Sequence, residues 1–157
     1  MPTPDMRPLG VLSIGVPYLD VETAHRHSQA TRRLLESTYR LVGPPEVMTD
    51  LDRLDAARDE FRLAGIQSLL LQIATFPDGE APARIAQRVD VQGVVHALPK
   101  PRLNRKVALN SLCGANMTTF TLTALEAPHL FRLAIRPSLL CSANSGPRYM
   151  RPWPSRS

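Results

Sequence analysis

The chain has 157 residues, of which 43% are hydrophobic and 21% are charged. This composition is ordinary for a globular protein and excludes fibrous and fully disordered classes, while the length suits one domain with its own core. No apolar stretch approaches the roughly 18 residues that a membrane-spanning helix needs, and no apolar signal core follows the first residues. The two cysteines, Cys113 and Cys141, are too few for a disulfide framework, so we expect a cytoplasmic protein without membrane contact.

The net charge of +5 comes from one end of the chain. Residues 1–126 contain all 14 acidic side chains and 14 of the 19 basic ones, whereas the remaining residues carry five arginines and no acid. A neutral body argues against a nucleic-acid groove, which needs clustered basic side chains on a folded face. We expect one domain over residues 1–135 and an irregular basic tail, rich in Arg, Pro and Ser, over residues 136–157. The tail is either disordered or the product of a shift out of the ancestral reading frame near residue 132.

Short apolar runs alternate along the chain with amphipathic patterns. The first run is nearly continuous and is closed by Pro17, as expected for a strand buried on both faces of a parallel sheet. Asp20 then offers a cap for the first helix, and Gly65 is the expected stop of the second. The expected strands cover residues 9–16, 46–49, 68–74, 91–98 and 130–135. The expected helices cover about residues 20–38, 52–64, 80–89 and 115–127, with Asp50 or Asp52 capping the second, Asp78 capping the third and Pro128 ending the fourth.

Strands and helices that alternate at about 20 to 25 residues per repeat are typical of βαβ units. Right-handed crossovers wind such units into a three-layer α/β fold, an open parallel sheet with helices on both faces, of the flavodoxin-like or Rossmann-like kind. Five strands favour the order 2-1-3-4-5. Because ligands lie beyond the carboxyl ends of such strands, we expect a site among the loops that begin at Pro17, Thr75 and Pro99 and at the Asn110 turn.

Nucleotide and metal sites find little support in the sequence. Neither glycine-rich phosphate-binding pattern, G-x-G-x-x-G or G-x-x-x-x-G-K-[ST], occurs in the chain. His25 and His27 point about 200° apart on a helix, so they cannot share one ion. His96 is expected to be a hydrogen-bonded core or edge residue, and His129 follows a helix end. We therefore expect no metal site and no catalytic residue that can be named from spacing alone.

Two further features have both a structural and a functional interpretation. Cys113 lies near the start of the fourth predicted helix, where the helix dipole lowers a thiol pKa and favours a nucleophile. We favour the simpler interpretation that Cys113 is a small buried residue that lets the turn pack on the sheet. The basic cluster of Arg102, Arg105 and Lys106 is expected to be a solvated loop, with a phosphate or partner contact as the alternative.

Three loops taken together resemble those of a known family. An opening strand ends in the sequence PYLD at residues 17–20, TFPDG follows the third strand at residues 75–79, and LNSLCGAN precedes the fourth helix at residues 109–116. Over about residues 8–131 this pattern resembles the N-terminal α/β domain of the L-fucose/L-arabinose isomerase family. The third loop is the most specific of the three.

The resemblance implies a metal-dependent isomerase that interconverts aldoses and ketoses through an enediol. In complete members Mn²⁺ is held by two carboxylates and a histidine from later domains, so this chain is expected to be an N-terminal fragment or homologue that is inactive alone. Its partners would be a sugar at a shared subunit interface and either a downstream catalytic chain or further copies of itself. The expected sugar contacts are Tyr18, Asp20, Thr75, Phe76 and Asn116. Relatives often carry an arginine just after the first strand, where this chain has Val16. The alternative function is a free-standing flavodoxin-like module that binds a small polar ligand.

Overall fold

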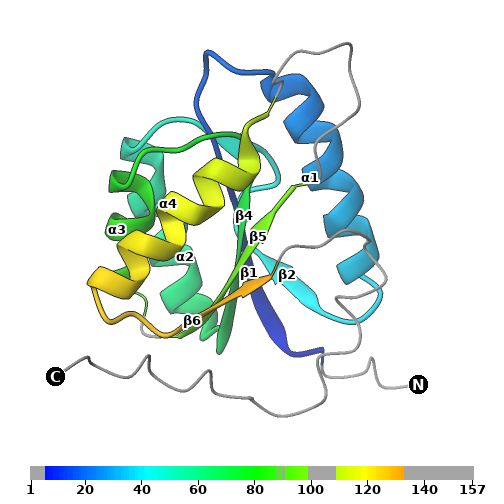
Figure 1. The fold of residues 1–157 in the computed structure, drawn as a ribbon. Helices are drawn as coiled ribbons and strands as arrows, with labels where there is room; N and C mark the ends of the chain where they lie inside the picture. The colour runs from blue at the N-terminus through cyan, green and yellow to red at the C-terminus, as the bar shows by residue number, and fades with distance from the viewer. Residues whose placement is uncertain (1–5, 88, 90, 99–108, 133–157) are drawn as a thin grey trace, which may run out of the picture.

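The computed structural model describes residues 6–87, 89, 91–98 and 109–132, and its elements follow the predicted alternation (Figure 1). All strand pairs are parallel, in the spatial order β2-β1-β4-β5-β6, with β3 also paired to β1. This confirms the open α/β sheet and its 2-1-3-4-5 order. The tail predicted over residues 136–157 lies outside the described residues. The elements are β1 (Pro8–Ile14), α1 (Val21–Leu35), β2 (Arg40–Val42), β3 (Val47–Met48), α2 (Asp52–Ala64), β4 (Ser68–Ile73), α3 (Glu80–Ala86), β5 (Gln92–Ala97), α4 (Ser111–Ala124) and β6 (His129–Arg132).

The strand predicted over residues 46–49 is one half of an interrupted edge strand. The structure has β2 paired with the start of β1 and β3 paired with its end. Gly43 separates them with a φ of +105°, and the two prolines that follow cannot donate to a strand ladder. The prediction missed β2 because three residues are too few for a recognisable apolar run.

Arg32 of α1 holds this interruption against the domain. Its guanidinium is buried and donates through Nη2 to the Gly43 carbonyl and through Nη1 to the Pro44 carbonyl, each at 3.1 Å. Carbonyl groups that leave a strand ladder need such partners, because an unpaired buried carbonyl is costly. The arginine therefore stabilises the break between β2 and β3.

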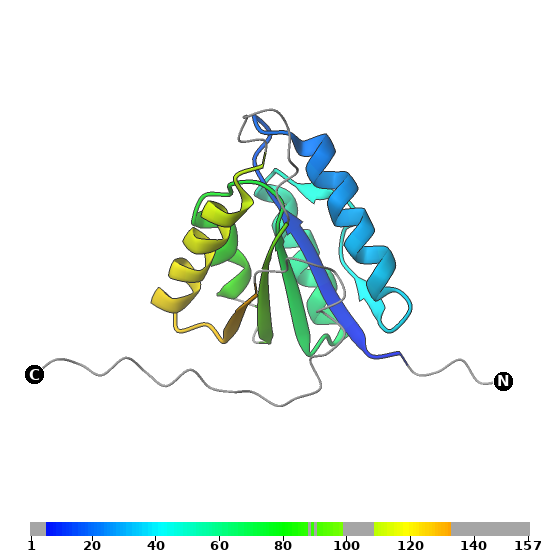
Figure 2. The same cartoon turned by 45° about the vertical axis from the view of Figure 1, so that its right-hand side comes forward.

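The helices divide unequally between the two faces of the sheet, with α1 on one face and α2, α3 and α4 on the other (Figure 2). The larger core lies under the three helices, around the fully buried Phe61 of α2. Two smaller clusters on the α1 face are built around Ala24 and Leu35. Helices on both faces, as predicted, give the three-layer arrangement. Among the described residues no helix is both long and apolar enough to cross a bilayer.

The starts of α1, α2 and α3 and the end of α2 agree with the prediction, whereas α1, α3 and α4 each end three residues earlier than predicted and α4 also starts earlier. Asp20 Oδ1 accepts a hydrogen bond from the Thr23 amide at 3.0 Å, and Gly65 ends α2 in the left-handed conformation, with a φ of +62°. Helix α4 begins at Ser111, four residues before the predicted start. It begins there because Asn110 turns the chain with a φ of +52° and Ser111 Oγ donates to the Leu98 carbonyl at the end of β5.

A buried polar row crosses the α1 face of the sheet. Ser13, Gln72 and His96 lie opposite one another on β1, β4 and β5. Ser13 Oγ donates to Gln72 Oε1 at 2.7 Å, and Ser28 Oγ of α1 donates to the same oxygen at 3.1 Å. His96 is 2% exposed on an interior strand, but neither ring nitrogen has a partner among the described residues, so the expected hydrogen bond is absent there. The Gln72 oxygen is taken by the two serines, and the Gln72 amide nitrogen, like the His96 ring, has no partner among the described residues.

Candidate functional site

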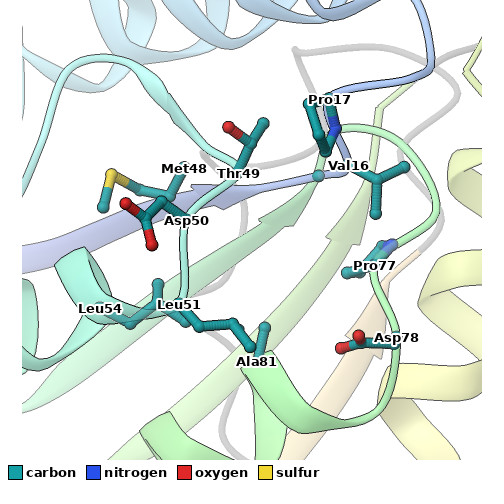
Figure 3. A pocket seen from close by; sticks show the side chains of 11 residues that line it. Val16, Pro17, Met48, Thr49, Asp50, Leu51, Leu54, Pro77, Asp78 and Ala81 are labelled. Carbon is teal, nitrogen blue, oxygen red and sulfur yellow. The ribbon is translucent and has the colours of Figure 1, made fainter.

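A hollow of about 200 Å³ lies beyond the carboxyl ends of β1 and β3 (Figure 3). Three loops form it: the one after β1, the one between β3 and α2, and the one between β4 and α3. This is the end of a parallel sheet at which ligands are expected. The residues that line it are Gly15, Val16, Pro17, Met48, Thr49, Asp50, Leu51, Leu54, Pro77, Asp78 and Ala81.

Two carboxylates supply most of the polarity of this hollow, from opposite sides (Figure 3). Asp50 Oδ1 accepts a hydrogen bond from the Asp52 amide at 2.9 Å, and Asp78 Oδ1 accepts one from the Glu80 amide at 3.1 Å. Each carboxylate is therefore held by the first amide of the helix that follows it, α2 or α3. The sequence predicted both as helix caps, and the structure places each one residue before the N-cap, Leu51 or Gly79, where its carboxylate accepts from the helix that follows. Within the described residues the second oxygen of each has no hydrogen-bond partner and can accept one from a ligand.

Thr75, one of the predicted sugar contacts, connects the loops beneath the hollow. It is fully buried, and its Oγ1 accepts a hydrogen bond from the Val16 amide at 2.7 Å. Gly15 permits this close approach, because a Cβ there would lie 2.5 Å from Thr75 Oγ1. Thr75 therefore links the loops after β1 and β4, next to the backbone hydrogen bond from the Ala74 amide to the Ile14 carbonyl.

The other predicted sugar contacts are not gathered at the hollow. Tyr18 is 76% exposed in the loop after β1, and Asp20 is engaged as the cap of α1. Phe76 is half-buried next to Thr75, whereas Asn116 is exposed on α4. None of the five predicted residues lines the hollow.

Thr49 and Asp50 are the site residues that the sequence interpretation missed. They follow directly on β3, so the rule that ligands bind at carboxyl ends of strands applies to them as it does to the other loops. The predicted strand at residues 46–49 ends at this turn, so its position already indicated that Thr49 and Asp50 lie at the carboxyl end of a strand. The loops expected to form the site follow the first, third and fourth predicted strands and do not include the loop after the second.

Comparison with known proteins gives relatives of low identity. Three of them are sulfoquinovose isomerases. Those of Priestia aryabhattai and Priestia megaterium are each 27% identical over 119 residues, which is 75% of this chain and 27% of the relative. That of Alkalicoccus urumqiensis is 30% identical over 112 residues, which is 71% of this chain and 25% of the relative. The chain thus spans about a quarter of the length of these relatives.

Other comparisons add little to this result. The HTH-type transcriptional regulator CelR of Thermobifida fusca is 34% identical over 65 residues, which is 39% of this chain. No protein-family model and no solved structure matches the chain. The predicted similarity to sugar isomerases is therefore confirmed at this coarse level, while the L-fucose/L-arabinose family itself stays a prediction.

The described residues do not form a metal site. None of their His, Cys, Asp and Glu side chains gather in groups of three or more that could hold an ion. His25 and His27 lie half-buried on α1, and His129 begins β6 with its Nδ1 2.8 Å from the Ala127 carbonyl. The Mn²⁺ expected for complete sugar isomerases therefore does not fit the side chains of the described residues.

The expectation that Cys113 is buried was wrong. Cys113 is exposed in the first turn of α4, and its neighbour Gly114 is the small residue that packs on the sheet. A Cβ on Gly114 would lie 2.7 Å from the Thr75 carbonyl and 2.8 Å from Pro77 Cδ. The basic cluster of Arg102, Arg105 and Lys106 and the Pro99 loop lie outside the described residues.

Proposed function

We propose that this chain is an N-terminal domain, as a fragment or a homologue, of a metal-dependent aldose–ketose isomerase of the L-fucose/L-arabinose type, and that it is inactive alone. Its role is to provide one wall of a sugar pocket that another domain or subunit completes. The observation that carries the proposal is the similarity to three sulfoquinovose isomerases over 71–75% of the chain. The position of the hollow supports it, because the hollow lies where α/β sheets bind ligands.

The size and lining of the hollow favour a shared pocket for sugar hydroxyls. Its volume of about 200 Å³ is below the roughly 300–1,000 Å³ typical of small-molecule sites. Asp50 and Asp78 can accept hydrogen bonds from hydroxyl groups, and Thr49 can donate or accept. The lining has no basic side chain, so a sulfonate or phosphate would be repelled here. Any charged substituent of the sugar would therefore lie against the part that completes the pocket.

Complete isomerases of this type use Mn²⁺ to polarise the sugar oxygens, and this chemistry would come from outside the described residues. The purified chain with added Mn²⁺ is therefore expected not to convert sulfoquinovose, L-fucose or L-arabinose to the corresponding ketose. Conversion of any of these sugars by the chain alone contradicts the proposed inactivity.

A chimera tests the claim that this chain provides one wall of a sugar pocket. The aligned residues of this chain replace the aligned quarter of the Priestia megaterium sulfoquinovose isomerase. We expect the chimera to isomerise sulfoquinovose, and Asp50→Ala or Asp78→Ala to lower kcat/KM roughly tenfold, the effect of losing one hydrogen bond to a charged group. A chimera with native circular dichroism but no turnover contradicts the assignment, as does turnover that neither variant changes.

A free-standing module for a small polar ligand is the second candidate. Asp50 and Asp78 favour this function. Each uses one carboxylate oxygen for a backbone amide, and the other oxygen can accept a hydrogen bond from a ligand without any contribution from a partner protein. This function predicts that one of a panel of sugars and phosphates raises the melting temperature of the chain in a saturable way. It also predicts that Asp50→Asn and Asp78→Asn abolish that increase. A pocket that needs a partner's wall predicts little change with every compound.

A further inference from the structure

Side chains of α1 hold the segment that joins β2 to β3. Three consecutive backbone carbonyls of this segment, those of Gly43, Pro44 and Pro45, each accept a hydrogen bond from α1. Arg32 donates to the first two at 3.1 Å each, and Gln29 Nε2 donates to the Pro45 carbonyl at 2.7 Å. The two prolines have no amide hydrogen and cannot act as donors in a strand ladder. Arg32 and Gln29 thus provide hydrogen bonds where the ladder is interrupted.

Arg32 also connects this segment with β1. Its side chain is only 7% exposed, and its Nη1 donates to the Val11 carbonyl of β1 at 3.4 Å. On the other side, the Gly43 amide donates to Glu60 Oε1 of α2 at 3.2 Å, but Glu60 is exposed to solvent. A buried hydrogen bond is electrostatically stronger than an exposed one, because the local dielectric constant is lower. Arg32 is therefore the firmer of these two attachments.

Strand β3 lies directly between the held segment and the hollow. It pairs with β1 over two residues only, and Met48, Thr49 and Asp50 then run along one side of the hollow (Figure 3). Both side chains of β3 are buried, but hydrophobic burial is non-directional and does not fix the position of a strand along its own axis. Hydrogen bonds do fix it, and those of Arg32 and Gln29 lie immediately before β3.

We propose that Arg32 and Gln29 are positioning residues for the wall of the hollow that Thr49 and Asp50 form. Neither lines the hollow, so both act through β3. A slip of β3 by one residue would move Asp50 by about 3.3 Å. Donor–acceptor distances in hydrogen bonds vary by only about 0.5 Å, so such a slip would separate Asp50 from a ligand held by Asp78. This inference rests on the proposed function, because it gives the wall a role in binding a ligand.

Two backbone amides at the end of β1 report separately on its two neighbours. The Gly15 amide donates to the Met48 carbonyl at 3.0 Å and reports the contact between β1 and β3. The Ala74 amide donates to the Ile14 carbonyl at 2.9 Å and reports the contact between β1 and β4. Amide hydrogen exchange of the full chain, followed by NMR, measures both in one sample. The ratio of the two exchange rates therefore separates a displaced β3 from a general loss of stability.

The first experiment compares this ratio among variants of α1. Gln29→Met and Arg32→Met remove the donors and keep long side chains, and each should speed exchange at Gly15 roughly tenfold relative to Ala74, the effect of losing one hydrogen bond. Arg32→Lys should restore part of the protection, because an ammonium group donates without the fork of a guanidinium. The matched control is Arg33→Met, since Arg33 is exposed on the same helix and should leave the ratio unchanged.

The outcome of this experiment is decisive even if one variant does not fold. Circular dichroism verifies folding, and Gln29→Met alone decides the question if Arg32→Met is unfolded. Equal acceleration at Gly15 and Ala74 shows a merely stabilising role and overturns the proposal. A Gln29→Met variant with an unchanged ratio overturns it as well.

The second experiment tests the consequence for the sugar pocket, in the chimera described above. Gln29→Met should lower kcat/KM several-fold when Asp50 is present and should have little further effect in an Asp50→Ala background, because it acts through that wall. Equal effects in both backgrounds overturn the positioning role. An inactive chimera contradicts the proposed function instead, and the Gly15 exchange ratio of the full chain then still decides whether Arg32 and Gln29 position β3.

Discussion

Asp20 shows how one side chain positions a functional loop. Its carboxylate accepts the Thr23 amide and fixes the start of α1, directly after the loop that borders the hollow. We expect Asp20→Ala to lower the melting temperature by a few degrees near neutral pH, because an N-cap hydrogen bond is lost. Thermal unfolding followed by circular dichroism measures the change. Asp20→Asn is the matched control and should lower it less, since asparagine also caps helices well.

The pH dependence of this effect has a defined sign. The hydrogen bond from the Thr23 amide lowers the pKa of Asp20 below its ordinary value of 3.8. A lowered carboxyl pKa contributes stability that is present above the unfolded-state pKa and is lost as pH falls through the folded-state pKa. The difference between wild type and Asp20→Ala should therefore shrink below about pH 3.8. A difference that is unchanged there would show that the charge of Asp20 plays no part.

His96 gives the protein a second pH dependence, in a different range. Burial lowers the pKa of His96 below its ordinary value of 6.5, so the ring is neutral in the fold and charges more readily in the unfolded chain. The free energy of unfolding should fall as the pH decreases below about 6.5, where the unfolded state binds more protons. His96→Leu should remove most of this fall and should not destabilise the protein at pH above 7, because the unpartnered ring nitrogens disappear.

Urea unfolding of wild type and His96→Leu at several pH values measures this dependence. His27→Gln is the control, since His27 lies half-buried on α1 away from the sheet core, and it should retain the wild-type dependence. Equal slopes for wild type and His96→Leu would refute the assignment to His96.

At the scale of an element, the packing of α4 on the sheet depends on one glycine. Gly114 approaches the Thr75 carbonyl so closely that a Cβ would lie 2.7 Å from the oxygen, and backbone cannot move aside as a side chain can. Gly114→Ala should therefore shift α4 outward and destabilise the protein by about 1–3 kcal/mol, as overpacking does in protein cores. The free energy of unfolding in urea measures this.

Asn116→Ala is the matched variant on the outer side of the same helix. Asn116 is exposed, so this substitution should change stability by less than about 0.5 kcal/mol. If Gly114→Ala were equally mild, the close contact between α4 and the loop after β4 would not limit the packing. Because Asn116 is also a predicted sugar contact, the same variant in the chimera tests that role separately from folding.

At the scale of the whole molecule, the sheet should be most stable at its centre. Strand β4 is paired on both sides, with β1 and β5, and five of its six residues are buried. We expect its amide hydrogens to exchange slowest, through global unfolding, while those of β2 and β3 exchange faster by orders of magnitude because these strands are short and lie at an edge. Hydrogen exchange followed by mass spectrometry measures both. Exchange in β4 as fast as in β2 would contradict the proposed distribution of stability.

The residues of the site were predictable only where local chemistry decides them. Asp50 and Asp78 could be predicted as caps because a carboxylate before a helix has a local partner in the first amides. Their convergence on one hollow also depends on the register in which β3 and β4 pair with β1, which the predicted strand order does not specify. The sequence placed Thr75 in a loop at the expected site. It could not show that the Thr75 hydroxyl accepts a hydrogen bond from the Val16 amide, because that bond depends on how closely the strands before the two loops approach each other.

The sequence by itself determined the alternation of strands and helices, the parallel order of the sheet and the starts of the first three helices, since apolar period and capping act over a few neighbouring residues. Only the tertiary structure decided that the edge strand is split into β2 and β3, that Gly114 rather than Cys113 contacts the sheet, and that α4 presents an apolar stripe outward. These outcomes depend on contacts between residues far apart in the chain. A pattern read along the sequence records which residues are apolar, whereas burial depends on which other elements cover them.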